Sequence, residues 1–348
     1  MNSTLRRFFI KTFSWEYWPV WVVYFPTGFY FTYLSIKAGS FFFFSAANPT
    51  IETGGMFFES KWKIFKLIPK EYYPTTILIE EKDDMVFIEQ QLQDLAIGFP
   101  LIAKPDRGGR GWGVKKICSL NELALYKSKV LIPFLIQAYA DYPIELSIFY
   151  YRDPNNEKGI ITSVTLKEML TIIGDGHSTV DQLIKKNDRA FLQYDKLKRQ
   201  NSIDLNKILP AGEEETIVPY GNHVLGATFL DYNHIIDEQL THTVDRISKS
   251  IDGFYFGRYD LRCNSIEELK MGANFSILEL NGAGAEPAHI YEPGFPFFKG
   301  QAVLFKHFNM LYKAAKANNK KGIPYMSYKD FKDMQLLEKT YRQKVTLS

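Results

Sequence analysis

The chain has 348 residues, of which 46% are hydrophobic and 23% charged, so it is long enough for more than one lobe, and wholesale disorder is excluded. A formal net charge of +3 is small for this length, and no basic stripe interleaved with aromatic residues indicates nucleic acid as a partner. The two cysteines, Cys118 and Cys263, do not have metal-binding spacing. A disulfide framework or a zinc site is therefore not expected, and a cytoplasmic setting is the default.

The first 57 residues are rich in Phe, Tyr and Trp. Positions 17–36 carry no charge over the length of a membrane span, but Pro19, Pro26 and Gly28 interrupt them. Three interpretations stay open: packing on the rest of the protein, contact of residues 8–44 with the inner face of a membrane, and a true span. Packing on the protein is favoured, and peripheral membrane contact is the main alternative.

Hydrophobic periodicity, capping residues and turn signals predict a mixed α+β chain. In chain order, the expected elements are a helix at 59–70, a strand at 75–80, a helix at 84–95, strands at 99–104 and 113–118, a helix at 119–129, strands at 134–139, 145–151 and 159–166, a helix at 179–186, a charged connector at 189–209, a strand at 216–220, a helix at 234–250, two acidic strands, and a basic helical tail from 301.

A glycine-rich turn follows the expected strand at 99–104, in the sequence FPLIAKPDRGGRGWGV (99–114). Lys104 ends the strand, and four of the next nine residues are glycines, which let backbone N–H groups approach phosphate oxygens closely. The pattern is neither a P-loop nor a dinucleotide fingerprint, because a strand follows instead of a helix. It favours a hairpin that covers a nucleotide triphosphate, and an ordinary flexible hairpin is the alternative.

Two later segments, FGRYDLRC (256–263) and ILELNGAGAEP (277–287), combine apolar runs with charged residues at alternate positions. Residues two apart on a strand share a face, so Arg258 lies beside Asp260 and Glu279 beside Asn281. If the two strands are neighbours, hard oxygen ligands suited to Mg²⁺ and one guanidinium converge. The alternative is a set of polar residues that face water.

In this order, the segments resemble the ATP-grasp superfamily, and within it the D-alanine–D-alanine ligase-like carboxylate–amine ligases, over residues 58–300. The resemblance implies an α+β ATP-grasp fold in which two subdomains hold ATP between them. Here an aromatic segment stands where the family has a complete preceding domain. The expected divisions are 1–57 (aromatic segment), 58–135 and 136–300 (the two ATP-grasp subdomains), and 301–348 (tail).

The resemblance also implies roles for individual residues. Arg258 would stabilise the transferring phosphoryl group, and Asp260, Glu279 and Asn281 would bind Mg²⁺ or Mn²⁺. The residues expected to bind ATP are Lys61, Lys104, Gly108, Gly109, Gly111, Gln137, Ala138, Tyr139, Glu145 and Lys167.

A narrower similarity concerns IGDGHSTVDQLI (173–184), which resembles the GDG-x-x-T loop of cyanophycin synthetase and some glutathione synthetases. A tight turn before a capped helix is the alternative. Asn222, His223, Glu286 and His289 fall in the expected substrate loops, although a structural role is favoured for both histidines. Because glycines and arginines replace the serines of the D-alanine ligase loop, D-alanyl-D-alanine is not expected as the product.

The predicted function is ATP- and Mg²⁺-dependent ligation of a carboxylate to an amine through an acyl phosphate, with release of ADP. Two alternatives stay open: an ATP-dependent phosphotransferase on the same fold, and a membrane-associated nucleotide-binding protein without catalysis. Fold alone identifies neither the acid nor the amine.

Overall fold

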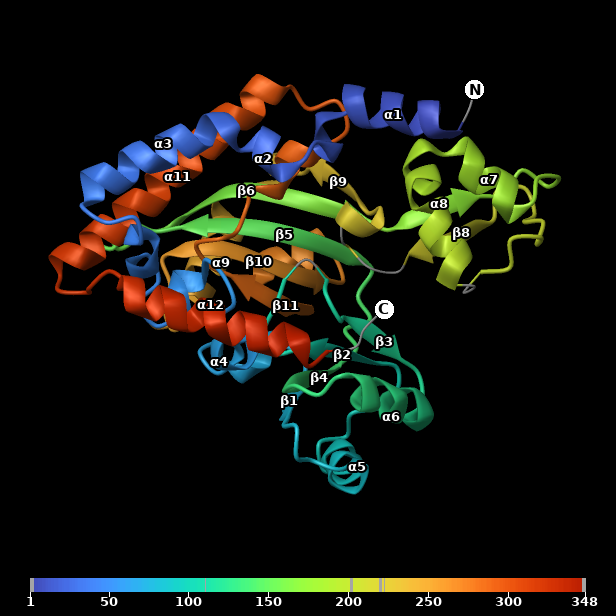
Figure 1. The fold of residues 1–348 in the computed structure, drawn as a ribbon, viewed down its shortest axis with the longest axis horizontal. Helices are drawn as coiled ribbons and strands as arrows, with labels where there is room; N and C mark the ends of the chain where they lie inside the picture. The colour runs from blue at the N-terminus through green and yellow to red at the C-terminus, as the bar shows by residue number, and fades with distance from the viewer. Residues whose placement is uncertain (1–2, 110, 201–202, 219–220, 222, 346–348) are drawn as a thin grey trace.

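The computed structural model describes residues 3–109, 111–200, 203–218, 221 and 223–345 (Figure 1). Its strands are β1 (Thr76–Ile79), β2 (Leu101–Pro105), β3 (Lys115–Ile117), β4 (Phe134–Ala138), β5 (Ile144–Tyr151), β6 (Ile160–Glu168), β7 (Leu170–Ile173), β8 (Glu214–Val218), β9 (Thr228–Asp231), β10 (Phe256–Cys263) and β11 (Phe275–Asn281). Its helices are α1 (Ser3–Phe13), α2 (Val20–Val23), α3 (Phe25–Ala38), α4 (Lys61–Phe65), α5 (Met85–Asp94), α6 (Leu120–Lys129), α7 (Val180–Lys186), α8 (Asp188–Gln200), α9 (Glu238–Ser250), α10 (Ile266–Met271), α11 (Phe297–Lys320) and α12 (Tyr328–Gln343). Helices packed on antiparallel sheets confirm the predicted α+β class.

The smaller lobe is built on a four-stranded antiparallel sheet in the order β1-β4-β2-β3. Helices α5 and α6 begin where predicted, because the side chains of Asp84 and Ser119 accept hydrogen bonds from the third residue beyond them. The C-terminal helix α12 also belongs to this lobe. Its Tyr341 packs into the core of the small sheet and donates a hydrogen bond to the carbonyl of Pro133 over 2.8 Å.

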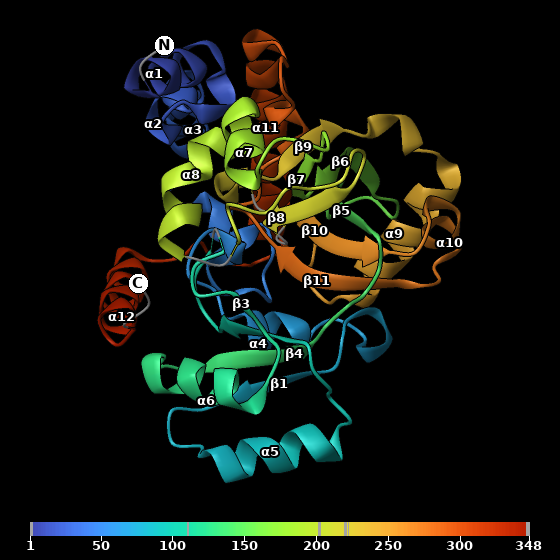
Figure 2. The same ribbon diagram turned by 90° about the vertical axis from the view of Figure 1, so that its right-hand side faces the viewer.

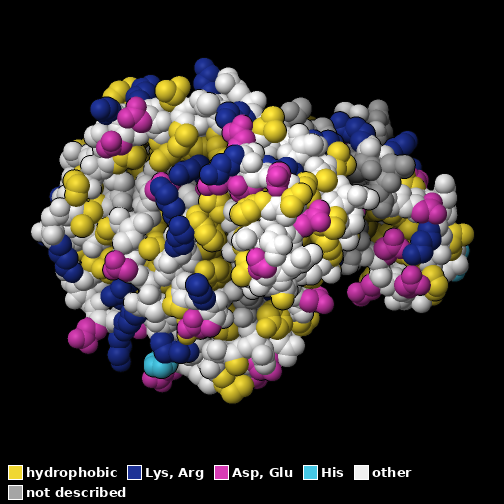
Figure 3. All heavy atoms as spheres, turned by 90° about the horizontal axis from the view of Figure 1, so that it is seen from below, with side chains coloured by type: hydrophobic (Ala, Val, Ile, Leu, Met, Phe, Trp, Pro, Cys, Tyr) yellow, Lys and Arg dark blue, Asp and Glu magenta, His cyan; other side chains and the backbone are white. Residues whose placement is uncertain are grey.

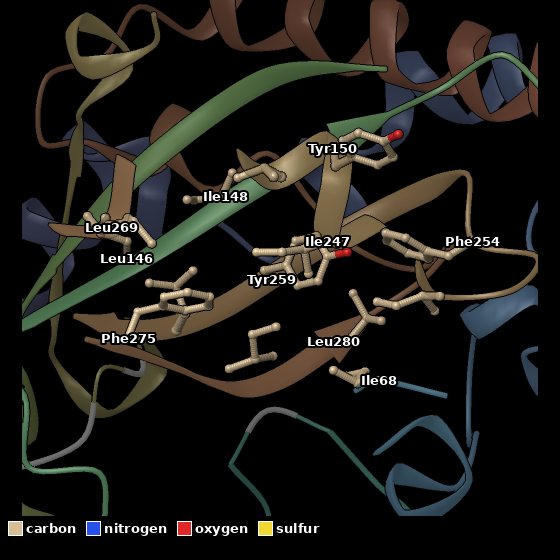
Figure 4. Close-up of a cluster of buried hydrophobic side chains, with 14 of the residues drawn as sticks. Ile68, Leu146, Ile148, Tyr150, Ile247, Phe254, Tyr259, Leu269, Phe275 and Leu280 are labelled. Carbon is tan, nitrogen blue, oxygen red and sulfur yellow. The ribbon is translucent and has the colours of Figure 1, made fainter. Parts of the chain in front are cut away.

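The larger lobe is built on a five-stranded antiparallel sheet in the order β11-β10-β5-β6-β9. One face of this sheet is apolar and is covered by α9 and α10, as the buried cluster in Figure 4 shows. On β5, Leu146, Ile148 and Tyr150 point into that cluster, so the alternate residues of this strand, among them Glu145 and Ser147, lie on the other face. That polar face carries the candidate site.

A small unit formed by β7, β8, α7 and α8 lies at one end of the molecule (Figure 1). Helix α7 begins with a capping box between Thr179 and Gln182. The charged connector expected at 189–209 is wrong over most of its length, because α8 occupies Asp188–Gln200 and buries Ala190 and Leu197 against the same core. The helix expected at 59–70 is also shorter, since α4 ends at Phe65, ahead of Pro69.

The aromatic N-terminal segment packs on the protein, as the favoured interpretation expected. Helix α3 lies against α11, and together they cover the end of the polar face of the large sheet (Figures 1 and 2). Phe43 and Phe44 are buried there with Phe149 and Phe256 of the sheet. Among the described residues, no helix has the length and apolar character needed to cross a bilayer.

Helix α11 makes folding sensitive to acid through His307. Its ring is buried against Phe149, Nε2 lies 2.9 Å from Oγ1 of Thr162, and Nδ1 lies 2.8 Å from the carbonyl oxygen of Val303. Burial lowers the pKa of His307 to about 4, so between pH 6.5 and 4 the unfolded chain binds a proton that the folded protein does not. Stability is therefore lost as the pH falls through this range, by about 2 kcal/mol at pH 5.

The variant His307→Leu should lose about 2 kcal/mol less than the wild type between pH 7 and pH 5, because this proton uptake is gone. Denaturant titrations at the two pH values measure the difference. His289 is also buried and its pKa is lowered. Because both proteins contain His289, its own proton uptake contributes to the acid loss of stability in each of them. Identical acid losses in the two proteins would contradict the assignment to His307.

Candidate functional site

The two acidic strands are neighbours, as predicted. Strands β10 and β11 pair antiparallel, with Asp260 opposite Glu279 and Arg258 opposite Asn281. On its other side β10 pairs with β5, which places Ser147 opposite Asp260. The side chains named here therefore share the polar face of the large sheet.

Asp260 is the centre of this face. Its carboxylate accepts two hydrogen bonds from Arg258, both 3.0 Å long, and one of 2.5 Å from the hydroxyl of Ser147. The amide nitrogen of Asn281 donates over 3.3 Å, and the ammonium of Lys167 lies 3.3 Å away. Burial alone would raise the pKa of Asp260, but the charges on Arg258 and Lys167 outweigh it and hold the pKa well below its usual range.

Two lysines outside the large sheet, one on α4 and one on β2, contact β11. Lys104, at the end of β2, donates to the carbonyl of Leu278 on β11 and to Oε1 of Gln137, both over 2.9 Å. Lys61, at the start of α4, lies 3.5 Å from the carboxylate of Glu279 and donates to the carbonyl of Gly108. Both lysines that the sequence predicted therefore contact β11, the strand that carries Glu279 and Asn281.

The environment of Lys104 disfavours its charged form. The ammonium is buried and lies 5.0 Å from the centre of the Phe65 ring. Burial lowers the pKa of Lys104 to about 8, although the nearby carboxylate of Glu279 acts in the opposite direction. A cation of this kind gains more than an exposed lysine when an anion approaches, because it has little water to lose.

A second charged row lies beside Asp260. Glu145 of β5 accepts a 3.0 Å hydrogen bond from Arg262 and lies 3.5 Å from the ammonium of Lys167. Gly221 closes over this pair, since a Cβ atom there would lie 2.1 Å from Oε1 of Glu145. Glu145 and Lys167, both expected to bind ATP, are thus side by side and paired with each other.

The glycine hairpin is tied to the N-terminal segment at its base. Arg107 donates to both oxygens of Glu52, over 2.8 and 3.2 Å, and Lys63 lies 2.5 Å from the same carboxylate. Burial alone would raise the pKa of Glu52, but these hydrogen bonds lower it to about 2. Within the loop, Gly108 has a positive φ of 119° and packs against Trp112, and Gly111 has a φ of 72°. Gly109 has open space around it, where a side chain would meet nothing within 4 Å.

Gln137, Ala138 and Tyr139, which the resemblance implies as ATP-binding residues, lie at the end of β4, where the chain passes from the small sheet to the large one; we call these residues the hinge. The side chain of Gln137 holds Lys104, and the hydroxyl of Tyr139 accepts a 3.1 Å hydrogen bond from Arg262. Ala138 and Tyr139 line a cavity of about 390 Å³ together with Gly98, Phe99, Pro100, Lys116 and Asp141. This cavity touches the hinge but none of the residues that surround Asp260.

The substrate-loop candidates separate into two groups. Glu286 belongs to the site, because its backbone oxygen accepts a 3.0 Å hydrogen bond from Arg258 and its carboxylate accepts one of 2.8 Å from Tyr291. His289 is buried, with Nδ1 at 2.6 Å from the hydroxyl of Ser163, and burial lowers its pKa. His223 bonds to the buried Glu16 over 2.9 Å, and Asn222 lies outside the described residues.

The GDG turn lies away from this face, in the small unit of β7, β8, α7 and α8. The carboxylate of Asp175 accepts hydrogen bonds from the backbone N–H and the hydroxyl of Ser178, and helix α7 follows, capped by Thr179. These contacts form a tight turn before a capped helix, which was the alternative interpretation of the GDG-x-x-T sequence.

The donor set fits a hard divalent cation. Glu279 has a carboxylate that is one-third exposed, and Asn281 donates its amide nitrogen to Asp260, which leaves the amide oxygen as an acceptor. In the described part of the chain, no three His, Cys, Asp or Glu side chains gather as a metal site, because this set has two carboxylates and one amide. Mg²⁺ usually takes one or two carboxylates and completes its shell with water and phosphate oxygens.

Sequence reasoning missed several charged residues around the site. Arg262 follows Asp260 by two positions, so the alternation that found Asp260 also predicts Arg262 on this face. Glu59 lies two residues before Lys61, and burial raises the pKa of its carboxyl. The contacts of Glu52 with Arg107 and of Glu16 with Arg189 join distant parts of the chain, and no local pattern predicts them.

The chain matches no protein-family model and no curated protein. Among solved structures it is similar to a bifunctional glutathione synthetase from Pasteurella multocida, at 15% identity and a TM-score of 0.38, over 71% of this chain and 36% of that one. It is also similar to the D-alanine–D-alanine ligases of Bacillus anthracis, at 14% identity and a TM-score of 0.43 over 75% and 69% of the two chains, and of Coxiella burnetii, at 9% and 0.43 over 78% and 60%. At these identities and TM-scores no activity follows from the likeness.

Proposed function

We propose that this protein is an ATP- and Mg²⁺-dependent carboxylate–amine ligase. The observation that supports the proposal is that Lys104 of the smaller lobe and Lys61 of α4 meet Leu278 and Glu279 of the large sheet, 2.9 and 3.5 Å apart. Paired ammonium groups facing hard oxygen ligands are the surroundings that a nucleotide triphosphate with its metal requires.

The roles follow from where the charges lie. Lys61 and Lys104 would neutralise the ATP phosphates beneath the hairpin that contains Gly108, Gly109 and Gly111. Arg258 lies next to Asp260, which fixes its guanidinium with two hydrogen bonds. A guanidinium held in this way can stabilise charge on the transferring phosphoryl group without moving first.

Asp260, Glu279 and Asn281 would hold Mg²⁺, which supplies neutralising charge to the phosphate oxygens when bound. Asp260 already accepts hydrogen bonds on both of its oxygens, whereas the ion pair of Glu279 within the described residues is the one with Lys61 at 3.5 Å. Glu279 is therefore the ligand that is most open to a metal.

The reaction balances as two displacements. An oxygen of the substrate carboxylate attacks the γ-phosphorus of ATP, the bond from phosphorus to the β,γ-bridging oxygen breaks, and ADP leaves. The nitrogen of the amine then attacks the acyl carbon, loses a proton, and releases inorganic phosphate as the amide forms. Water must be kept away from the acyl phosphate, which is a task for the hairpin.

The test is ADP release from ATP and Mg²⁺ with pools of amino acids, peptides and cell-envelope precursors, followed by mass spectrometry of the products. We expect ADP release that requires both a carboxylate and an amine, together with a new amide. A stable phosphorylated product would replace the proposal with a phosphotransferase. ATP binding without ADP release in any pool would replace it with a non-catalytic nucleotide-binding protein.

A further inference from the structure

Helix α1 has its apolar side turned to solvent. Its arginines face the protein, where Arg6 and Arg7 pair with Asp188 and Asp195 of α8 and lie 4.5 and 5.2 Å from the centre of the Phe191 ring. Its exposed apolar residues are Leu5, Phe8, Phe9 and Phe13, with exposed fractions of 47, 61, 42 and 80%. An amphipathic helix of a globular protein normally buries its apolar side and exposes its charged side. The apolar side of α1 is therefore expected to contact a second apolar surface.

Helices α2 and α3 continue this feature along the same edge of the molecule, at the top of Figure 1. The buried side of α3 carries Thr27, Leu34, Ser35 and Ala38. Its outer side and α2 expose Trp21, Phe25, Phe29, Tyr33 and Ile36, each more than half exposed. These positions recur at intervals of three and four, which is one face of a helix. We call these five residues and the four of α1 the apolar edge.

Basic residues outnumber acidic ones around the apolar edge and on α11, although Asp188 and Asp195 of α8 pair with the arginines of α1. Glu16 is the one acidic residue between positions 3 and 51, and it is buried between Arg189 and His223. Helix α11, which packs on α3, has five lysines and no acidic residue. Lys299, Lys306, Lys313 and Lys320 are exposed and recur every seven residues, so they form one stripe along α11. By contrast, the face seen in Figure 3 carries acidic and basic side chains intermixed.

We propose that the apolar edge inserts into the surface of a lipid bilayer with anionic headgroups. Exposed Phe and Ile side chains supply the buried area, Trp and Tyr suit the headgroup level, and the neighbouring lysines attract the lipid phosphates. A second copy of the chain fits less well, because two such edges would bring like charges together. A neutral or acidic protein partner would not explain why apolar residues extend along three successive helices.

The test is flotation of the full chain with vesicles of phosphatidylcholine and phosphatidylglycerol in equal parts, and with phosphatidylcholine alone. We expect binding to the anionic vesicles that weakens as salt is raised. The triple variant Phe13→Ser, Trp21→Ser, Phe29→Ser should bind at least about tenfold more weakly, because three large apolar side chains no longer enter the bilayer. The matched control is Val86→Ser, Met271→Ser, Leu336→Ser, which removes three residues of similar exposure elsewhere and should bind like the wild type.

A second measurement does not depend on the triple variant. Lipids brominated in the acyl chain should quench the fluorescence of the wild-type protein, and Trp21→Phe should lose most of that quenching. Failure of the wild type to float with anionic vesicles would overturn the proposal, as would equal binding by the two triple variants. Self-association that the first triple variant abolishes, in a protein that ignores vesicles, would assign the apolar edge to a second copy of the chain.

Discussion

Replacing Glu279 by Gln is expected to lower ATP turnover by about 10³-fold while the melting temperature stays unchanged. Gln keeps the shape of the side chain but removes the negative charge that faces Lys61 at 3.5 Å. The side chain is one-third exposed, so the loss of this pair costs little stability. Steady-state ADP release and thermal unfolding of the same preparation measure the two effects.

The control for this variant is Glu168→Gln, which removes an exposed carboxylate from the end of β6, next to Lys167. It lowers the net negative charge of the large sheet by the same amount and should leave turnover unchanged. If Glu279→Gln retains turnover close to that of Glu168→Gln, the acidic strands do not hold the metal, and the assignment of this face as the active site is wrong.

Asp260 differs from Glu279 because its carboxylate also holds the site together. It is buried and pairs with Arg258 and Lys167, so neutralising it removes the carboxylate that Arg258 pairs with, while Lys167 keeps Glu145 at 3.5 Å. Removing one member of a buried ion pair typically costs about 3–5 kcal/mol. Loss of activity in an Asp260 variant therefore combines a structural effect with a chemical one, whereas an unchanged melting temperature in Glu279→Gln would show that its loss of activity is chemical.

Much of this site could be predicted from the sequence because its residues follow the alternation of strands. In β10 and β11, polar residues interrupt apolar runs at every second position, and the register of the pair then brings Asp260 opposite Glu279. Lys104 was found in the same way, at the end of an apolar strand that leads into glycines. Such signals involve residues that are close in the sequence, so they can be recognised without knowledge of the tertiary structure.

The features that could not be predicted depend on contacts between distant parts of the chain. The expected substrate loop that contains His223 is followed by a strand that the sequence did not predict, β9, which forms the edge of a sheet whose other strands lie elsewhere in the sequence. Helix α8 did have a local signal, because Ala190, Phe191, Tyr194 and Leu197 recur at helical spacing, but its many charged residues favoured a connector. The pair between Glu52 and Arg107 spans 55 residues and has no local signal.

Replacing Lys104 by Met is expected to lower kcat/KM for ATP by about 10²-fold and to remove a fall in this parameter that the wild type shows above pH 8. Burial lowers the pKa of Lys104 to about 8, so the free protein loses this positive charge as the pH rises through that value. Only the ammonium form attracts the ATP phosphates, and kcat/KM should therefore fall with a limiting slope of about tenfold per pH unit. Once ATP is bound, its negative charge favours the ammonium, so kcat should depend less on pH.

The measurement is the pH profile of kcat/KM and of kcat between pH 6.5 and 9.5, in the wild type and in Lys104→Met. Met fills a similar volume without a charge, so it tests the cation and not the packing against Phe65. A matched control is Lys116→Met, which removes an ammonium from the neighbouring strand β3, where it lies 4.3 Å from the centre of the Tyr139 ring. If Lys116→Met loses the same pH dependence, or if Lys104→Met keeps it, the ionising group that binds ATP is not Lys104, and the two lobes do not hold the triphosphate between Lys104 and β11.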